Sequence, residues 1–157
     1  MSENQTKIGV VSCSGEDCLG GTISRLATRK MLEKIYPEET VTICLPLYLA
    51  GGEEERSFAN DYPTISVDGC SKYCAKRATE KYSGKVSAEI NVADIIGKET
   101  AEQGPLSGRD ITSEHLQMVE QVVEQIQVKF DEVLNKPNSK KKNDGDGGCC
   151  CGGNCGC

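Results

Sequence analysis

The sequence predicts an α/β fold: a small Rossmann-like, three-layer domain with a mainly parallel four-stranded sheet and a disordered Cys-rich tail. Two observations predict it. Segments typical of strands and of helices alternate along residues 1–135, as in a parallel sheet covered by helices. Residues 136–157 contain no Val, Ile, Leu, Met, Phe or Tyr, so they cannot build a core. We therefore expect one domain over residues 1–135 and a flexible Lys-, Gly- and Cys-rich tail over residues 136–157.

Short apolar runs rich in β-branched residues mark the strands of the predicted sheet. Each run is followed by a turn or by Pro, and each is too short for a helix of ordinary length. The four predicted strands are Lys7–Ser12, Val41–Leu45, Thr64–Val67 and Val86–Val92.

Helical spacing of apolar residues marks three main helices between and after these strands. The first is expected to begin with Thr22 as its cap and to stop before Pro37, and the last to run from near Ser113 to near Asn135. The second covers Ser71–Ser83, with Ser71 as cap. Residues 51–60 are expected to hold a short helix, and residues 97–110 are read as a loop.

Composition and charge exclude several classes of function. The net charge of -6 does not attract a phosphate backbone, so we expect no nucleic-acid partner. The apolar runs fall short of the roughly 18 residues that span a bilayer, so no membrane contact is expected. The first residues do not resemble a signal peptide, which indicates the reducing cytoplasm. Ten cysteines in that compartment favour metal or redox chemistry over a disulfide scaffold.

Four cysteines follow or end the predicted strands. They are Cys13, Cys44, Cys70 and Cys74. Strands of a parallel sheet point the same way, so these thiols can meet at one edge, where such sheets bind ligands. Four thiolates match a tetrahedral zinc site. Helix N-termini and Lys72 are expected to favour the thiolate form.

Other roles remain open for some of these residues. Cys44 is either a metal ligand or a buried small hydrophobe inside its strand. Cys18 is a fifth ligand, a resolving thiol or a bystander. Asp68 either lies behind the metal ligands and supports them or serves as a turn or helix cap.

The spaced pattern around these cysteines resembles the DGC-domain proteins, which are named for an Asp-Gly-Cys motif. The matching segments are Cys13-Ser14-Gly15, then Cys44-Leu45 with Gly51-Gly52, then residues 68–77, DGCSKYCAKR. The resemblance covers roughly residues 7–96. It implies zinc binding through Cys13, Cys44, Cys70 and Cys74, but no established reaction, and it says nothing about the tail.

The loop from Cys13 to Cys18 also resembles the Cys-x4-Cys loop of low-molecular-weight tyrosine phosphatases and related arsenate reductases. Those enzymes place an Arg directly after the second Cys, and here that residue is Leu19. Glu16 and Asp17 would repel an oxyanion within the loop. The sequence therefore argues against an anion-binding role for this loop.

The tail holds a second set of thiols. Its cysteines are Cys149, Cys150, Cys151, Cys155 and Cys157. Soft thiolates select zinc, Cu(I) or comparable metalloids, so the tail is a candidate collector of such ions. A simple thiol buffer is the plainer interpretation. The lone His115 is expected to be a surface residue at a helix start.

Three functional hypotheses follow. The first is a cytoplasmic metal-binding protein that binds, senses or delivers zinc or a soft metalloid, with an unidentified protein as its partner. The second is a thiol redox or sulfur-transfer enzyme that uses Cys13 with Cys18 or Cys70 with Cys74. The third is an interaction module in which the metal is structural. The sequence leans away from an enzyme without deciding the matter.

Overall fold

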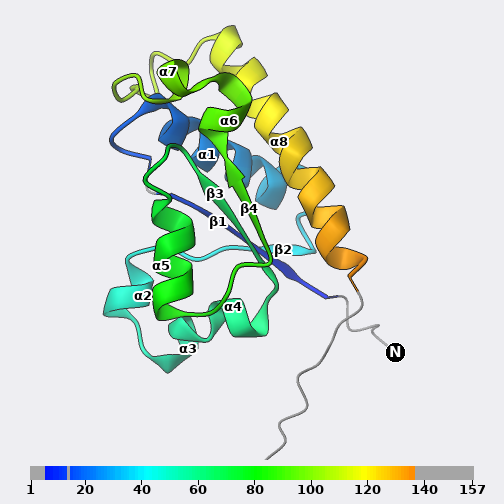
Figure 1. Ribbon diagram of the computed structural model, residues 1–157. Coiled ribbons are helices and arrows are strands. Elements are labelled where there is room, and N and C mark those ends of the chain that lie inside the picture. The colour runs from blue at the N-terminus through cyan, green and yellow to red at the C-terminus, as the bar shows by residue number, and fades with distance from the viewer. Residues whose placement is uncertain (1–5, 14, 137–157) are drawn as a thin grey trace, which may run out of the picture.

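The computed structural model describes residues 6–13 and 15–136 (Figure 1). Within them lies a four-stranded sheet in the order β2-β1-β3-β4, and every pair of neighbouring strands is parallel. The strands are β1 (Ile8–Ser12), β2 (Thr40–Val41), β3 (Thr64–Asp68) and β4 (Ala88–Asn91). The predicted α/β class with four parallel strands is confirmed. The predicted disorder of the tail concerns residues outside those described.

Helices connect the strands and follow the last of them. In chain order they are α1 (Leu19–Lys30), the π-helical turn η1 (Met31–Ile35), α2 (Leu47–Ala50), α3 (Glu53–Arg56), α4 (Phe58–Asp61), α5 (Cys74–Tyr82), α6 (Val92–Ile96), α7 (Lys98–Ala101) and α8 (Ser113–Leu134).

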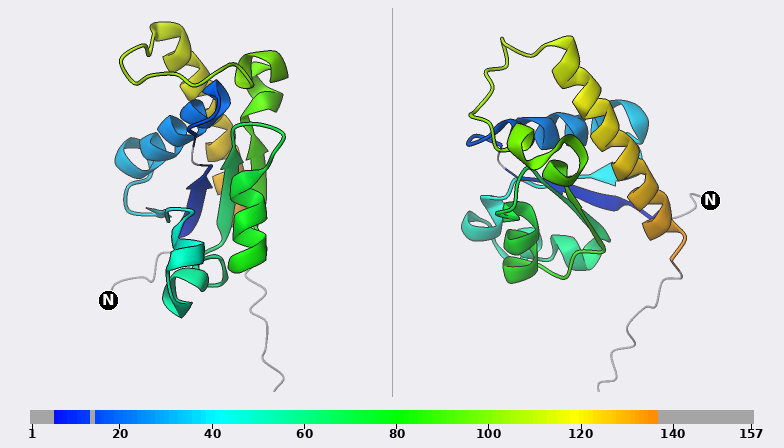
Figure 2. Two further views of the ribbon diagram at one scale, coloured as in Figure 1. Left: turned by 90° about the vertical axis from the view of Figure 1, so that its left-hand side faces the viewer. Right: turned by 45° about the horizontal axis from the view of Figure 1, so that its top comes forward.

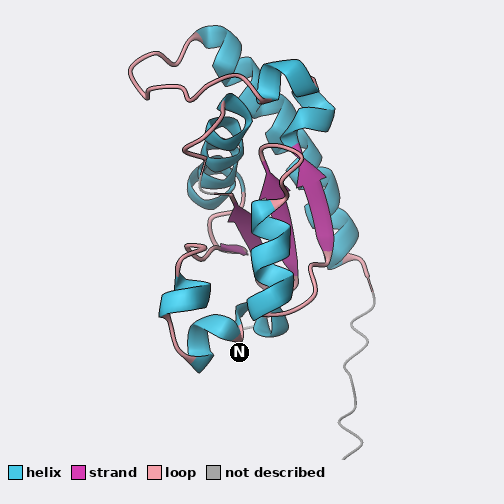
Figure 3. Cartoon of the chain, turned by 60° about the vertical axis from the view of Figure 1, so that its left-hand side comes forward, coloured by secondary structure: helices cyan, strands magenta, loops and turns pink. Residues whose placement is uncertain are grey.

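Helices cover both faces of the sheet, which makes three layers (Figures 2 and 3). Alternate residues of a strand face opposite sides. Ile8 and Val10 of β1 therefore enter the larger core, against α1 and α8, whereas Val11 faces the smaller core beneath α5. Tyr48 of α2 and Phe58 of α4 complete this smaller core.

The long helix α8 agrees with its prediction. Thr112 caps it and accepts a hydrogen bond from the backbone N–H of His115, and Asn135 ends it. Its buried residues follow helical spacing: Val119, Val122, Val123, Ile126, Phe130 and Val133. That stripe packs against α1 and the sheet, so periodicity alone was enough to predict this element.

The start of α1 differs from the prediction. Cys18, not Thr22, is the N-cap, and the helix begins at Leu19. Thr22 lies inside the helix with its hydroxyl donating to the carbonyl of Gly15. Gly20 and Gly21 made a helix start here look unfavourable, but tertiary contact outweighs their low propensity.

The second strand was predicted too long. β2 ends at Val41, and the Thr42 hydroxyl donates to the carbonyl of Val10 at 2.7 Å. A side chain thus replaces the backbone ladder, and the chain leaves the sheet before Cys44. For this reason Cys44 is exposed rather than within a buried strand.

Two further boundaries were wrong. The helix predicted over residues 71–83 begins at Cys74, because Tyr73 adopts a left-handed conformation with φ of 50°. The stretch after β4 is also more ordered than predicted. The residues Val92–Ile96 and Lys98–Ala101 form α6 and α7, with Asn91 capping α6 through its side chain. Only the rest of the predicted loop is irregular.

Candidate functional site

The strand order creates a switch point between β1 and β3. From β1 the chain crosses to β2 on one side and then returns to β3 on the other side. Crevices of this kind, at the carboxyl ends of the strands, are where open α/β sheets bind ligands. Cys13 directly follows β1, and Cys70 lies two residues beyond the end of β3.

The two loops at this switch point touch backbone to backbone. A Cβ atom on Gly20 would lie 2.1 Å from the carbonyl oxygen of Gly69, and one on Gly69 would lie 2.2 Å from the amide nitrogen of Gly21. Glycine is needed here because no other residue leaves room for so close an approach. The contact joins the first turn of α1 to the Asp-Gly-Cys turn, and with it Cys18 to Cys70.

Side-chain bonds reinforce this contact. The Lys72 ammonium lies 2.6 Å from the Asp17 carboxylate, and the Ser71 hydroxyl donates to Glu102 at 3.1 Å. Beside them opens a cavity of about 260 Å³. Its lining consists of the residues that make these bonds and of two thiols, Cys18 and Cys70.

Four thiols gather at this edge and influence one another: Cys13, Cys18, Cys70 and Cys74, which we call the thiol cluster. Burial raises the pKa of the Cys18 thiol, a hydrogen bond from Gly21 opposes this, and the Cys70 and Cys13 thiols raise it further. The sequence left Cys18 open as a fifth ligand, a resolving thiol or a bystander. The feature that could have found it is the pair of glycines, Gly20 and Gly21, opposite Gly69.

Cys74 responds in the same direction. Burial raises its pKa, and the negative charges of Asp68, Cys13 and Cys70 raise it further, while Lys72 acts to lower it. The expectation that helix ends and Lys72 favour thiolates is therefore wrong for Cys18 and Cys74. The reason is that Lys72 is already paired with Asp17, so desolvation and like charge dominate.

The thiol cluster consists of donors that suit a soft metal ion, since all four are sulfur. Their present arrangement is not that of a metal site. Over residues 6–13 and 15–136, no group of three or more His, Cys, Asp or Glu side chains is placed to hold a metal ion. Cys13, for example, has its sulfur 3.3 Å from the Ser24 hydroxyl. Metal binding would require these side chains to rotate towards one point.

Cys44 does not line the cavity beside Cys18 and Cys70. Its thiol lines a separate, largely apolar cavity of about 370 Å³, which it shares with Cys13, Arg25 and Arg29. Cys13 is therefore a member of the thiol cluster that also lines the cavity of Cys44. Whether Cys44 is a metal ligand stays a prediction from the sequence.

Asp68 is buried at the end of β3, with 1 % of its surface exposed. Its carboxylate accepts hydrogen bonds from the backbone N–H of Ala75 at 2.6 Å and of Lys76 at 3.1 Å. Burial raises the pKa of this carboxyl, and these two N–H groups act to lower it. The observed contacts are those of a helix cap, one of the two roles that the sequence left open. Support of a metal ligand stays a prediction.

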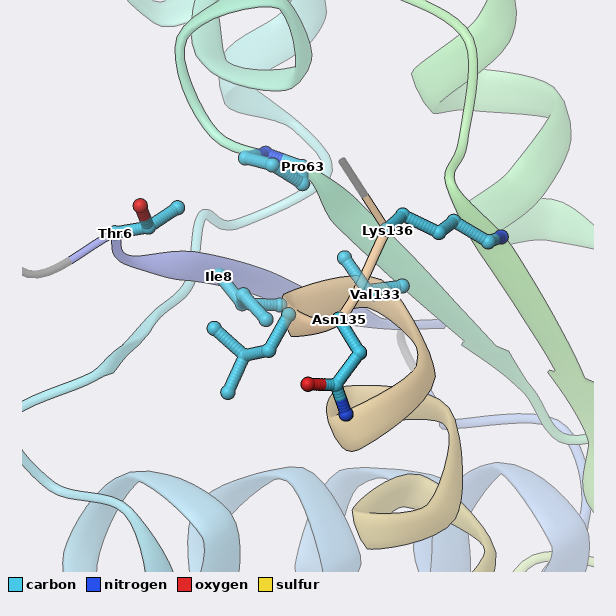
Figure 4. A pocket seen from close by; sticks show the side chains of 7 residues that line it. Thr6, Ile8, Pro63, Val133, Asn135 and Lys136 are labelled. Atoms are coloured by element: carbon cyan, nitrogen blue, oxygen red, sulfur yellow. The ribbon is translucent and has the colours of Figure 1, made fainter. Parts of the chain in front are cut away.

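Other sequence candidates lie elsewhere. The five tail cysteines are outside the described residues. His115 lies at the start of α8, where its ring nitrogen accepts from the backbone N–H of Thr112 at 3.1 Å. A further cavity, of about 420 Å³, opens at the amino ends of β1 and β3 and has no thiol in its lining (Figure 4). It is lined by Thr6, Ile8, Pro63, Val133, Leu134, Asn135 and Lys136.

Comparison with known proteins decides the family. The family model named DGC domain matches residues 9–127. The chain belongs to the DGC domain family. The match spans β1, the Asp-Gly-Cys turn and most of α8, so it includes every member of the thiol cluster. No curated protein and no solved structure shows significant similarity to this DGC domain.

One finding bears on the membrane. Among the helices of the described residues of this DGC domain, none is both long and apolar enough to cross a bilayer.

Proposed function

We propose that this DGC domain is a metal-binding protein of the reducing cytoplasm that binds, senses or delivers zinc. The thiol cluster would hold the ion, with Cys13 after β1, Cys18 at the start of α1, and Cys70 and Cys74 around the Asp-Gly-Cys turn. When bound, zinc would tie the two loops of the switch point together through sulfur. The partners of this domain would be the metal ion or a soft metalloid, and an unidentified protein that supplies or receives it.

The observation that carries this proposal is the position of the four thiols at the carboxyl edge of the sheet, where the contact of Gly20 and Gly21 with Gly69 brings their two loops together. Four sulfur donors from three chain segments suit a tetrahedral zinc site. Because protons compete with the metal for these thiols, the raised pKa values of Cys18 and Cys74 mean that zinc binding strengthens as pH rises. The sequence-based set differs by one residue, with Cys44 in place of Cys18.

The test measures zinc and Co(II) binding in reducing buffer. The full chain carries serines in place of all five tail cysteines, so that only metal bound by the domain is measured. We expect about one equivalent of metal, with Co(II) showing thiolate charge-transfer bands. Cys70→Ser and Cys18→Ser should each weaken zinc binding by more than about 100-fold. Even the loss of a residue that only hydrogen-bonds to a ligand lowers metal affinity about 10- to 100-fold.

Cys44→Ser is the matched control. It removes an exposed thiol outside the thiol cluster and should leave the affinity unchanged. Loss of binding in Cys44→Ser with retention in Cys18→Ser would replace our set by the one predicted from the sequence. Circular dichroism of each variant shows whether the fold is intact. A folded parent chain that takes up no zinc or Co(II) would overturn the proposal.

A further inference from the structure

Cys18 and Cys70 form a pair that the sequence did not suggest. Both residues line one cavity of about 260 Å³, although they come from different loops of the switch point, and Cys70 raises the pKa of the Cys18 thiol. The pairs suggested by the sequence were Cys13 with Cys18 and Cys70 with Cys74. In the structure the Cys13 sulfur instead contacts the Ser24 hydroxyl at 3.3 Å.

The pair is held in place by groups other than the thiols. The glycine contact described above fixes the two backbones against each other, and the Lys72–Asp17 ion pair joins the residues beside the thiols. The amide of Leu19 also donates to the carbonyl of Gln103 at 2.9 Å. Two thiols that line one cavity on a fixed frame can reach the disulfide bond length of about 2.05 Å by rotation of their side chains.

A small molecule can reach the pair. Both thiols line the cavity of about 260 Å³, and the rest of its lining is polar or charged. A cation (Lys72), a carboxylate (Asp17) and a hydroxyl (Ser71) stand beside the sulfurs. Lys72 and Asp17 form an exposed ion pair with each other, so the ammonium and carboxylate groups of a small thiol compound would bind here by exchange with that pair.

We propose that Cys18 and Cys70 form a redox-active dithiol that reduces low-molecular-weight disulfides. The cavity beside them would bind the small thiol that is joined to the protein in the mixed disulfide. One thiolate of the pair attacks a sulfur of the disulfide. The S–S bond breaks, one small thiolate leaves, and a mixed disulfide remains on the protein. The other thiolate then attacks the protein sulfur of that mixed disulfide, which releases the second small thiolate and closes Cys18–Cys70.

The reaction balances without a further oxidant. Two protein thiols give up two electrons and two protons, and the small disulfide takes both to become two thiols. A small reduced thiol in excess reverses both steps and restores the dithiol.

One consequence rests on the proposed function. If the thiol cluster holds zinc, closure of Cys18–Cys70 removes two of its four donors. Oxidation would then release the ion, and the redox state of the pair would control metal binding.

The test uses the full chain, freed of metal by a chelator and treated with glutathione disulfide. Free thiols are then blocked by alkylation, and linked peptides are mapped by mass spectrometry. We expect a Cys18–Cys70 linkage in most molecules. Cys18→Ser and Cys70→Ser should each lose this linkage and retain glutathione on the remaining thiol of the pair. Cys44→Ser, which changes a thiol outside the pair, should keep the linkage.

Persistent glutathione on Cys18 or Cys70 of the unmodified chain would overturn the proposal, as would a dominant Cys13–Cys18 or Cys70–Cys74 linkage. Because the protein is free of metal throughout, the result does not depend on whether the domain binds zinc. A separate assay of zinc release by glutathione disulfide tests the consequence for the metal. Mapping the unmodified chain decides the matter even where a variant fails to fold.

Discussion

Asp68 shows how one residue of the family motif serves the fold. It ends β3, and its buried carboxylate binds two backbone N–H groups in the first turn of α5. Those N–H groups have no partner within their own helix, so the carboxylate satisfies them. The bonds aim α5 at the switch point and set the position of Cys74. The Asp of the motif is thereby explained without a metal.

Replacing Asp68 should therefore cost stability. Asp68→Ala removes both hydrogen bonds from a buried site, and we expect the free energy of unfolding to fall by about 1–3 kcal/mol. Asp68→Asn is the matched variant, and it should cost less because its amide oxygen can still accept from one N–H. Urea denaturation of the parent chain and of the two variants measures the order of their free energies of unfolding. An equal loss in both variants would mean that the charge, not the hydrogen bonding, stabilises the helix.

The same residue predicts a dependence on pH. Burial raises the pKa of Asp68 in the folded state above its ordinary value of 3.8. The part of its contribution that depends on the bound proton is thus fully present below that ordinary value and is lost as pH rises through the folded-state pKa. The free energy of unfolding of the parent chain, relative to Asp68→Asn, should fall as pH rises through this range. Urea denaturation at several pH values checks it, and a rising difference would contradict it.

At the scale of elements, the decisive contact joins the start of α1 to the turn between β3 and α5. Gly20 and Gly21 would weaken a helix in isolation, by up to about 1 kcal/mol each relative to Ala. They occur here because the turn at Gly69 lies against them with no space for a Cβ atom. This contact brings Cys18 to Cys70, so the thiol pair depends on glycines rather than on either cysteine's own element.

Gly20→Ala tests this contact. The new Cβ would lie 2.1 Å from the Gly69 oxygen, so the two elements must move apart. We expect the clash to outweigh the gain in helix propensity and to lower the free energy of unfolding by about 2 kcal/mol or more. Gly104→Ala is the control, since a Cβ there meets nothing within 4 Å. Thermal and urea unfolding measure both, and similar stabilities would show that the loops shift at little cost.

At the scale of the whole molecule, α8 closes the larger core and ends near the amino ends of the strands (Figure 1). The thiol cluster lies at the opposite, carboxyl edge of the sheet. Val133 is the last buried residue of α8, and residues 134–136 are exposed. Within residues 6–13 and 15–136, the core therefore ends at Val133 of α8.

Removing residues 137–157 should accordingly leave the domain folded. We expect the free energy of unfolding to change by less than about 0.5 kcal/mol, as for surface changes in general. The shortened chain should also keep about one equivalent of zinc, if the thiol cluster is the site. Thermal melts and elemental analysis are the measurements. A loss of more than about 1 kcal/mol would mean that the tail packs on the domain.

The sequence by itself determined the α/β class, the four strands, the long helix α8 and the placing of Cys13 and Cys70 after β1 and β3. These depend on hydrophobic periodicity and on the rule that parallel strands end at one edge, and both can be read locally. The clustered thiols followed from the same rule.

Only the tertiary structure decided which thiols meet. The Thr42 hydroxyl ends β2 early, so Cys44 is exposed and does not line the cavity of Cys18 and Cys70. The contact of Gly20 with Gly69 starts α1 at Leu19 and brings Cys18 towards Cys70. Both events are contacts between residues far apart in the chain. Local propensity favoured the opposite outcome in each case, because it cannot register what lies against a residue once the chain has folded.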